Sequence, residues 1–179
     1  MSNGFENMGM TDSLKITVQR PQVDGTLKVV EERETFPRGI NPVVKSLMQF
    51  MQKFGLFTKY HGDLIVNAGI ADIAQLIYDQ YDYVGIGTGT TAAAAADTQL
   101  ETQVETRVAP TKSLVTTTIT NDTAQFSAQF TLTAPRAITE SGCFVAASGG
   151  VMLCRQVFSA LNLASGDIVT FVWKIQVSR

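Results

Sequence analysis

The chain has 179 residues, a formal net charge of −2, 17% charged residues and 45% hydrophobic residues. This length suits one well-packed domain and is too short for two ordinary ones, and the apolar content is sufficient for a folded core. Because there is no basic excess to attract phosphate groups, we expect neither a nucleic-acid partner nor a membrane partner.

The sequence gives no sign of export. No basic segment followed by an apolar one stands at the start, and the longest apolar stretches are interrupted before they reach the length of a membrane span. We therefore expect a soluble protein made in the cytoplasm. Cys143 and Cys154 are the two cysteines, and in that compartment we expect reduced, half-buried thiols in neighbouring strands rather than a disulfide.

Residues 1–13 show no hydrophobic periodicity and predict an extended N-terminal arm. Phe5, Met8 and Met10 have no obvious local core to join, so they are candidate anchors on a neighbouring subunit or shell. The alternative interpretation is a disordered leader. The arm hypothesis predicts an oligomer, in the first instance a homotrimer.

Residues 14–179 predict a single mainly-β domain. Alternating residues from Leu14 to Glu31, interrupted by turn residues at 21–25, predict a β-hairpin. Helical spacing over residues 41–55, and again from Asn67 or Gly69 to Tyr78, predicts a helical insertion at about 41–80. Strand character returns at residues 81–86.

From Ser113 onward the pattern is almost entirely that of β-strands. Turn signals at Asn121-Asp122 and at residues 148–150 predict two further hairpins. A last strand follows, with one apolar face made of Val169, Phe171, Trp173, Ile175 and Val177. The fold class is therefore mainly β (α+β), an antiparallel β-sandwich or barrel with one or two short helices and an extended N-terminal arm.

The glycine-rich stretch "YVGIGTGTT" does not match a phosphate-binding loop. A Walker-type loop needs lysine and then serine or threonine after its last glycine, but Thr90, Thr91 and five alanines follow Gly89. The dinucleotide fingerprint needs a third glycine where Thr90 stands. Gly85, Gly87 and Gly89 instead alternate as in a strand, so they are predicted to allow close packing of other groups.

The remaining residues give no support for an enzyme, a cofactor or a metal site. His61 is the single histidine, so a cluster of several histidine ligands is impossible. The two cysteines lack the paired spacing of a zinc site, and no serine has the surroundings of a hydrolase nucleophile. Paired carboxylates such as Glu31-Glu32 stand in polar stretches, where a solvated face is the ordinary interpretation.

Glu140 and Arg155 are predicted to form a structural ion pair. If the hairpin turns about Ala147 and Ser148, the two residues lie opposite each other on one side of the sheet. A partly buried, bidentate pair is our preferred interpretation, and a solvated pair is the alternative. A turn centred on Ser148 and Gly149 would instead place Glu140 opposite Val157.

Four segments in this order resemble a recurring pattern in structural proteins of tailed-bacteriophage particles. They include "GTGTTAAAAADTQL" and "RQVFSALNLASGD" and span residues 65–77, 83–107, 138–167 and 168–177. The sequence departs from the pattern in having alanine where proline often interrupts the small-residue run, and Gln103 where glutamate is common.

The resemblance implies a virion component without enzymatic activity, assembled in the cytoplasm of a bacterial host. A head decoration (cement) protein, bound to the major capsid protein or another virion protein, is the first interpretation. A tail, collar or baseplate component is the second. A carbohydrate- or receptor-binding β-domain is the third, and it would need an exposed aromatic platform, whereas Trp173 is predicted to face the core.

Overall fold

A computed structural model of the chain describes residues 9–22, 25–35 and 65–178. It confirms the mainly-β prediction, because two antiparallel sheets and one helix form a sandwich-like α+β fold. The predicted helix at 41–55 lies outside the described residues. The second predicted helix is confirmed as α2, which spans Asn67–Gln80.

The larger sheet has five strands in the order β2-β1-β8-β5-β4. The strands are β1 (Gly9–Pro21), β2 (Leu27–Thr35), β4 (Thr111–Val115), β5 (Thr123–Thr131) and β8 (Ile168–Ser178). The smaller sheet has the order β3-β6-β7, with β3 (Tyr83–Gly87), β6 (Arg136–Phe144) and β7 (Met152–Leu163). All six strand pairs are antiparallel, and three of them, β1–β2, β4–β5 and β6–β7, join strands that are consecutive in the chain.

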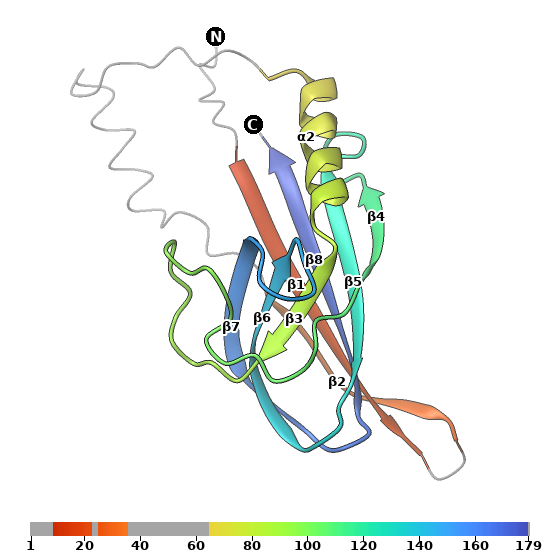
Figure 1. Ribbon diagram of the computed structural model, residues 1–179. Helices are drawn as coiled ribbons and strands as arrows, with labels where there is room; N and C mark the ends of the chain where they lie inside the picture. The colour runs from red at the N-terminus through yellow and green to blue at the C-terminus, as the bar shows by residue number, and fades with distance from the viewer. Residues whose placement is uncertain (1–8, 23–24, 36–64, 179) are drawn as a thin grey trace, which may run out of the picture.

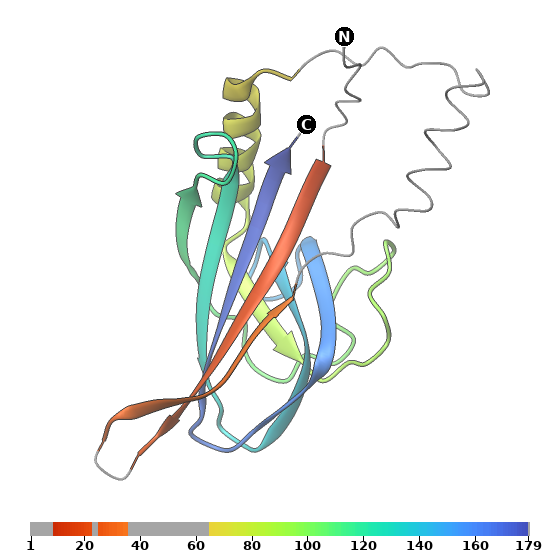
Figure 2. The ribbon, with the colours of Figure 1, turned by 180° about the vertical axis from the view of Figure 1, so that it is seen from behind.

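The smaller sheet and α2 cover the same face of the larger sheet (Figures 1 and 2). Helix α2 lies at the end where β8 finishes, and it buries Ile70, Ala74 and Ile77. The smaller sheet covers the other end, and the β1–β2 hairpin projects beyond it. The interior therefore lies between one long sheet and two shorter elements placed end to end.

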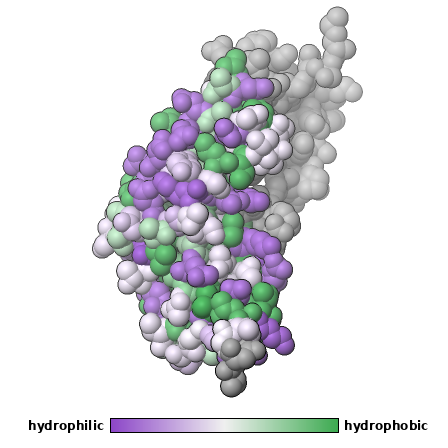
Figure 3. Space-filling view, turned by 90° about the vertical axis from the view of Figure 1, so that its right-hand side faces the viewer, coloured by the Kyte–Doolittle hydropathy of each residue, from purple (hydrophilic) through white to green (hydrophobic). Residues whose placement is uncertain are grey.

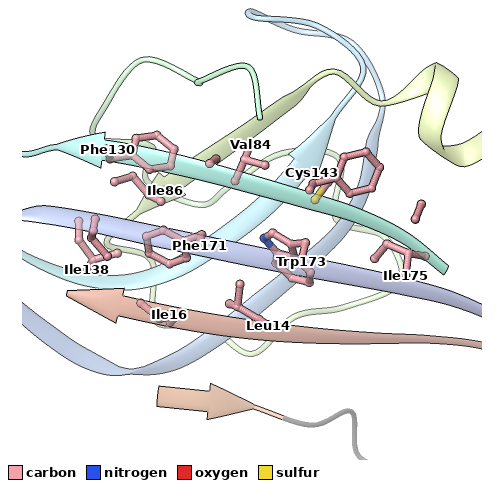
Figure 4. Packing of buried hydrophobic residues seen from close by; sticks show 14 of the residues in the cluster. Leu14, Ile16, Val84, Ile86, Phe130, Ile138, Cys143, Phe171, Trp173 and Ile175 are labelled. Carbon is pink, nitrogen blue, oxygen red and sulfur yellow. The ribbon is translucent and has the colours of Figure 1, made fainter. Parts of the chain in front are cut away.

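The predicted apolar face of the last strand is confirmed. Each of the five residues from Val169 to Val177 on that face is at most 2% exposed. Trp173 and Phe171 lie at the centre of the core, with Leu14 and Ile16 from β1 beside them (Figure 4). Burying a side chain of this size contributes roughly 1.5–3 kcal/mol to stability. The indole nitrogen of Trp173 donates to Ser141 Oγ at 3.2 Å, so its polar group is satisfied.

The boundary predicted for the N-terminal arm needs correction. Strand β1 begins at Gly9, and its first five residues pair with residues 174–178 of β8. The backbone of Met10 therefore belongs to the sheet of its own chain, opposite Val177. The pairing depends on a strand at the far end of the sequence, so local periodicity could not reveal it. Phe5 and Met8 lie outside the described residues.

The three predicted hairpins are present, but the predicted register of β6 and β7 is wrong. Glu140 lies opposite Val157, and Arg155 lies opposite Gly142. Gly149 and Gly150 both have positive φ, 62° and 72°, a conformation that glycine adopts without steric cost. These two glycines lie in the turn, beside which Phe144 pairs with Met152, and an irregularity of the ladder between Cys143 and Phe144 then shifts the pairing by one residue and gives the alternative register at Glu140.

Candidate functional site: a buried carboxylate beneath the glycine-rich segment

Residues 88–110 connect β3 to β4 and lie over the outer face of the smaller sheet; we call them the crossing segment (Figure 1). In β3, Val84 and Ile86 belong to the core. Alternation along the strand then directs Gly85 and Gly87 toward the crossing segment. Gly85 and Gly87 thus lie where the smaller sheet meets the crossing segment.

The predicted close packing at these glycines is present. A Cβ atom at Gly87 would lie 2.5 Å from the carbonyl oxygen of Thr102 and would also collide with the Glu140 carboxylate. At Gly89 it would lie 2.5 Å from Glu101 Cβ. Gly85 has more room, with a nearest contact of 3.1 Å. The missing side chains therefore make space for a carboxylate and for the crossing segment, not for a nucleotide phosphate.

Glu140 is fully buried and accepts four hydrogen bonds. Its Oε1 accepts from the backbone N–H groups of Gly89 (2.9 Å) and Thr102 (2.8 Å). Its Oε2 accepts from the Glu101 backbone N–H (3.1 Å) and from Arg155 Nε (2.8 Å). One side chain of β6 therefore holds both ends of the stretch from residue 89 to residue 102.

The ion pair between Glu140 and Arg155 is present and buried, with 0% and 4% of the two side chains exposed. Because the residues are diagonal neighbours rather than opposite ones, the predicted bidentate contact does not form. Only Nε reaches Glu140. The other nitrogens donate to Asp97 Oδ2 at 2.8 Å, to the Thr91 carbonyl at 3.1 Å and to Glu101 Oε2 at 3.5 Å.

We call Asp97, Glu101, Glu140 and Arg155 the ion cluster. Burial favours the neutral form of Glu140, but the hydrogen bonds from Thr102, Arg155 and two further backbone groups outweigh it and lower its pKa below the ordinary value. Backbone hydrogen bonds also lower the pKa of Asp97 and of Glu101. All three carboxylates are therefore ionised around one guanidinium at neutral pH.

The sequence did not reveal a second attachment of the crossing segment, made by Arg107. Its guanidinium lies 3.4 Å from the centre of the Phe144 ring and donates to the carbonyl oxygens of Ala146 (3.0 Å) and Gly149 (2.6 Å). Burial lowers its pKa. Its Nε also donates to the nearby Gln103 Oε1 at 3.0 Å, but the three partners that attach it to the hairpin are about 40 positions away and leave no local pattern.

Two more buried carboxylates, Asp122 and Asp167, hold loops and were also missed. Asp122 accepts from the backbone N–H groups of residues 117, 118 and 119 at 2.8 Å each. Asp167 accepts two hydrogen bonds from Arg20, at 2.8 and 2.9 Å, which join the β1–β2 hairpin to the β7–β8 turn. An aspartate in a turn is a familiar signal, but its burial is visible only in the fold.

The ion cluster is suited to holding structure rather than to proton transfer. A general base works best with a pKa near the working pH, whereas the pKa of Glu140 is lowered and its oxygens are occupied by donors. Among the described residues, no group of three or more histidine, cysteine or acidic side chains is arranged to bind a metal ion. Within the same residues, no helix is long and apolar enough to cross a membrane.

Comparison of the chain with protein families, with curated proteins and with solved structures gives no match.

Proposed function

We propose that the chain is a non-enzymatic structural component of a phage particle, specifically a capsid decoration protein that binds and stabilises the head shell as a homotrimer. The proposal starts from the sequence resemblance to virion proteins. It is supported by the use of the buried charged groups, since the ion cluster fixes a long surface segment to a sheet. A segment fixed in this way offers a surface of constant shape to a neighbour.

The observation that carries the proposal is the apolar surface of strand β2. Leu27, Val29 and Val30 are 47%, 50% and 43% exposed on the hairpin that projects from the sandwich. In Figure 3 apolar side chains lie beside the tip of this hairpin, at the lower end of the molecule. β2 is also an edge strand of its sheet, and apolar edge strands are normally protected from association unless a partner covers them.

The position in the particle is tested by separating purified heads from tails and detecting the chain in each fraction by mass spectrometry. We expect it in the heads. Detection only in tails would contradict the decoration role and would support the alternative of a tail, collar or baseplate protein. No observation favours a carbohydrate-binding role, because the large apolar side chains exposed among the described residues are all aliphatic.

The apolar surface is tested with heads that lack the protein. Replacing Leu27 and Val29 by serine removes two side chains that would each contribute roughly 1.5–3 kcal/mol when buried, so binding should weaken at least about tenfold. Leu76→Ser is the matched control, since Leu76 is 60% exposed on helix α2. Equal binding by all variants would remove the support that β2 gives to the proposal.

A further inference from the structure

The two cysteines lie directly opposite each other in the smaller sheet. Cys143 of β6 is the register partner of Cys154 of β7, and both are present as thiols. Opposite residues of an antiparallel pair carry their side chains on the same face of the sheet. The sulfur atoms therefore belong to the same side of the β6–β7 hairpin.

The register places the two Cα atoms within the range that a disulfide spans. Opposite residues in antiparallel strands have Cα atoms about 4.5 or 5.5 Å apart, depending on the type of pair. Disulfides span Cα separations of about 4.4–6.8 Å, so both types fall within the range. The Cβ atoms of opposite residues lie about 4.5–5.5 Å apart and those of a disulfide about 3.5–4.5 Å, so bond formation requires side-chain rotation and draws the two strands slightly together.

The two thiols differ in access. Cys143 is 1% exposed and belongs to the hydrophobic core, where Figure 4 shows its sulfur. Cys154 is half-buried and packs against the same core from the edge strand β7. A small reagent therefore reaches Cys154 first, and Cys143 is shielded from it.

We propose that Cys143 and Cys154 form a disulfide-forming site in which Cys154 is the reactive thiol and Cys143 the resolving thiol. The Cys154 thiolate attacks a low-molecular-weight disulfide, which breaks the S–S bond of the reagent, releases one small thiolate and leaves a mixed disulfide on Cys154. The Cys143 thiolate then attacks the Cys154 sulfur and releases the second small thiolate. The cysteine pair loses two electrons and two protons, and the small disulfide is reduced to two thiols.

The biological setting of this chemistry depends on the proposed function. A particle assembled in a reducing cytoplasm carries both thiols, and a particle released into an oxidising medium acquires the bond. The bond then ties the edge strand β7 to β6, next to Arg155 and the ion cluster. The chemistry of the site itself does not depend on the role in a virion.

The test uses the native full-length chain, reduced and then freed of reductant, and an aromatic disulfide whose released thiolate is coloured. The wild type should release two equivalents of thiolate and keep no adduct, with a chain mass lower by two hydrogen atoms. Cys143→Ala should release one equivalent and keep the adduct on Cys154. Cys154→Ala should release none until the chain is denatured.

A stable adduct on the wild type, a Cys154→Ala variant that reacts as fast as the wild type, or chains linked to each other on a non-reducing gel would each overturn the proposal. If Cys143→Ala does not fold, peptide mapping of the oxidised wild type decides, because the linked peptide must contain both cysteines. If the isolated chain forms the disulfide but the chain is not found in purified particles, the proposed function is contradicted and the proposal for the two cysteines still stands.

Discussion

Replacing Glu140 by glutamine should destabilise the fold strongly, although the two side chains have nearly the same shape. The amide supplies one acceptor oxygen where the carboxylate supplies two. If this oxygen keeps the hydrogen bonds from Gly89 and Thr102, the NH2 group faces the N–H groups of Glu101 and Arg155. Each of these donors then lacks an acceptor.

The size of the effect follows from burial. Each unsatisfied buried donor costs about 1–3 kcal/mol, whereas the charge of Arg155 keeps Asp97 and Glu101 as ionic partners. Summed over the two donors, we therefore expect Glu140→Gln to lower the free energy of unfolding by about 2–6 kcal/mol. A domain has a total stability of about 5–15 kcal/mol, so the loss would be a large part of it.

The measurement is urea unfolding followed by the fluorescence of Trp173, the single tryptophan of the chain, which lies in the core. The matched control is the exposed ion pair of Lys15 and Glu32, whose side chains are 47% and 55% exposed. Glu32→Gln should cost no more than about 1 kcal/mol. If Glu140→Gln costs as little as Glu32→Gln, the argument that the ion cluster holds the crossing segment is wrong.

Three further predictions concern other parts of the chain. Burial raises the pKa of Asp122, but hydrogen bonds lower it to about 2 from 3.8, so its ionised form stabilises the fold fully above pH 3.8. In the wild type this contribution of about 2 kcal/mol should be lost as the pH falls from 3.8 toward 2. When the free energy of unfolding is measured across this pH range, Asp122→Asn should not show this loss. Gly87→Ala should lower the urea midpoint, because the added Cβ would lie 2.5 Å from Thr102 O. Gly69→Ala in α2, where the nearest contact is 3.4 Å, should raise the midpoint, because alanine stabilises a helix by about 0.5–1 kcal/mol relative to glycine. The opposite order of the two midpoints would contradict the close packing at Gly87. Removal of residues 1–8 should leave the wild-type urea midpoint unchanged but weaken trimer formation, as measured by light scattering. Removal of residues 1–13 should also lower the urea midpoint, because residues 9–13 pair with β8. If the chain without residues 1–8 forms trimers and decorates heads as well as the full chain, the arm hypothesis is wrong.

The elements with their own periodicity were predictable from the sequence. The apolar face of β8, the stripe of α2 and the three hairpin turns are local signals, and each is present in the structure. The start of β1 was not predictable, because residues 9–13 are held by a partner strand more than 150 positions away. The register of β6 and β7 depended on the exact turn and on an irregularity of the ladder between Cys143 and Phe144, and the turn signal alone reveals neither.

The ion cluster was only partly predictable. A lone acid in one strand and a lone base in the next suggested the pair of Glu140 and Arg155, and shared strand alternation placed both on the same face even in the wrong register. The roles of Asp97 and Glu101 could not be inferred, because both belong to a segment without regular structure. Their positions follow from the path of the crossing segment, which only the folded chain defines.

The contacts of Glu140 explain why a charged group occupies this buried position. The backbone N–H groups of Gly89, Glu101 and Thr102 in the crossing segment converge on one point above the smaller sheet. An apolar side chain there would leave all three donors unsatisfied, at about 1–3 kcal/mol each. An isolated buried ion pair can often be replaced by apolar residues without loss, but this carboxylate also completes the hydrogen bonding of the backbone. The glycines of β3 are part of the same solution, because the carboxylate reaches the three donors only where β3 carries no Cβ atoms.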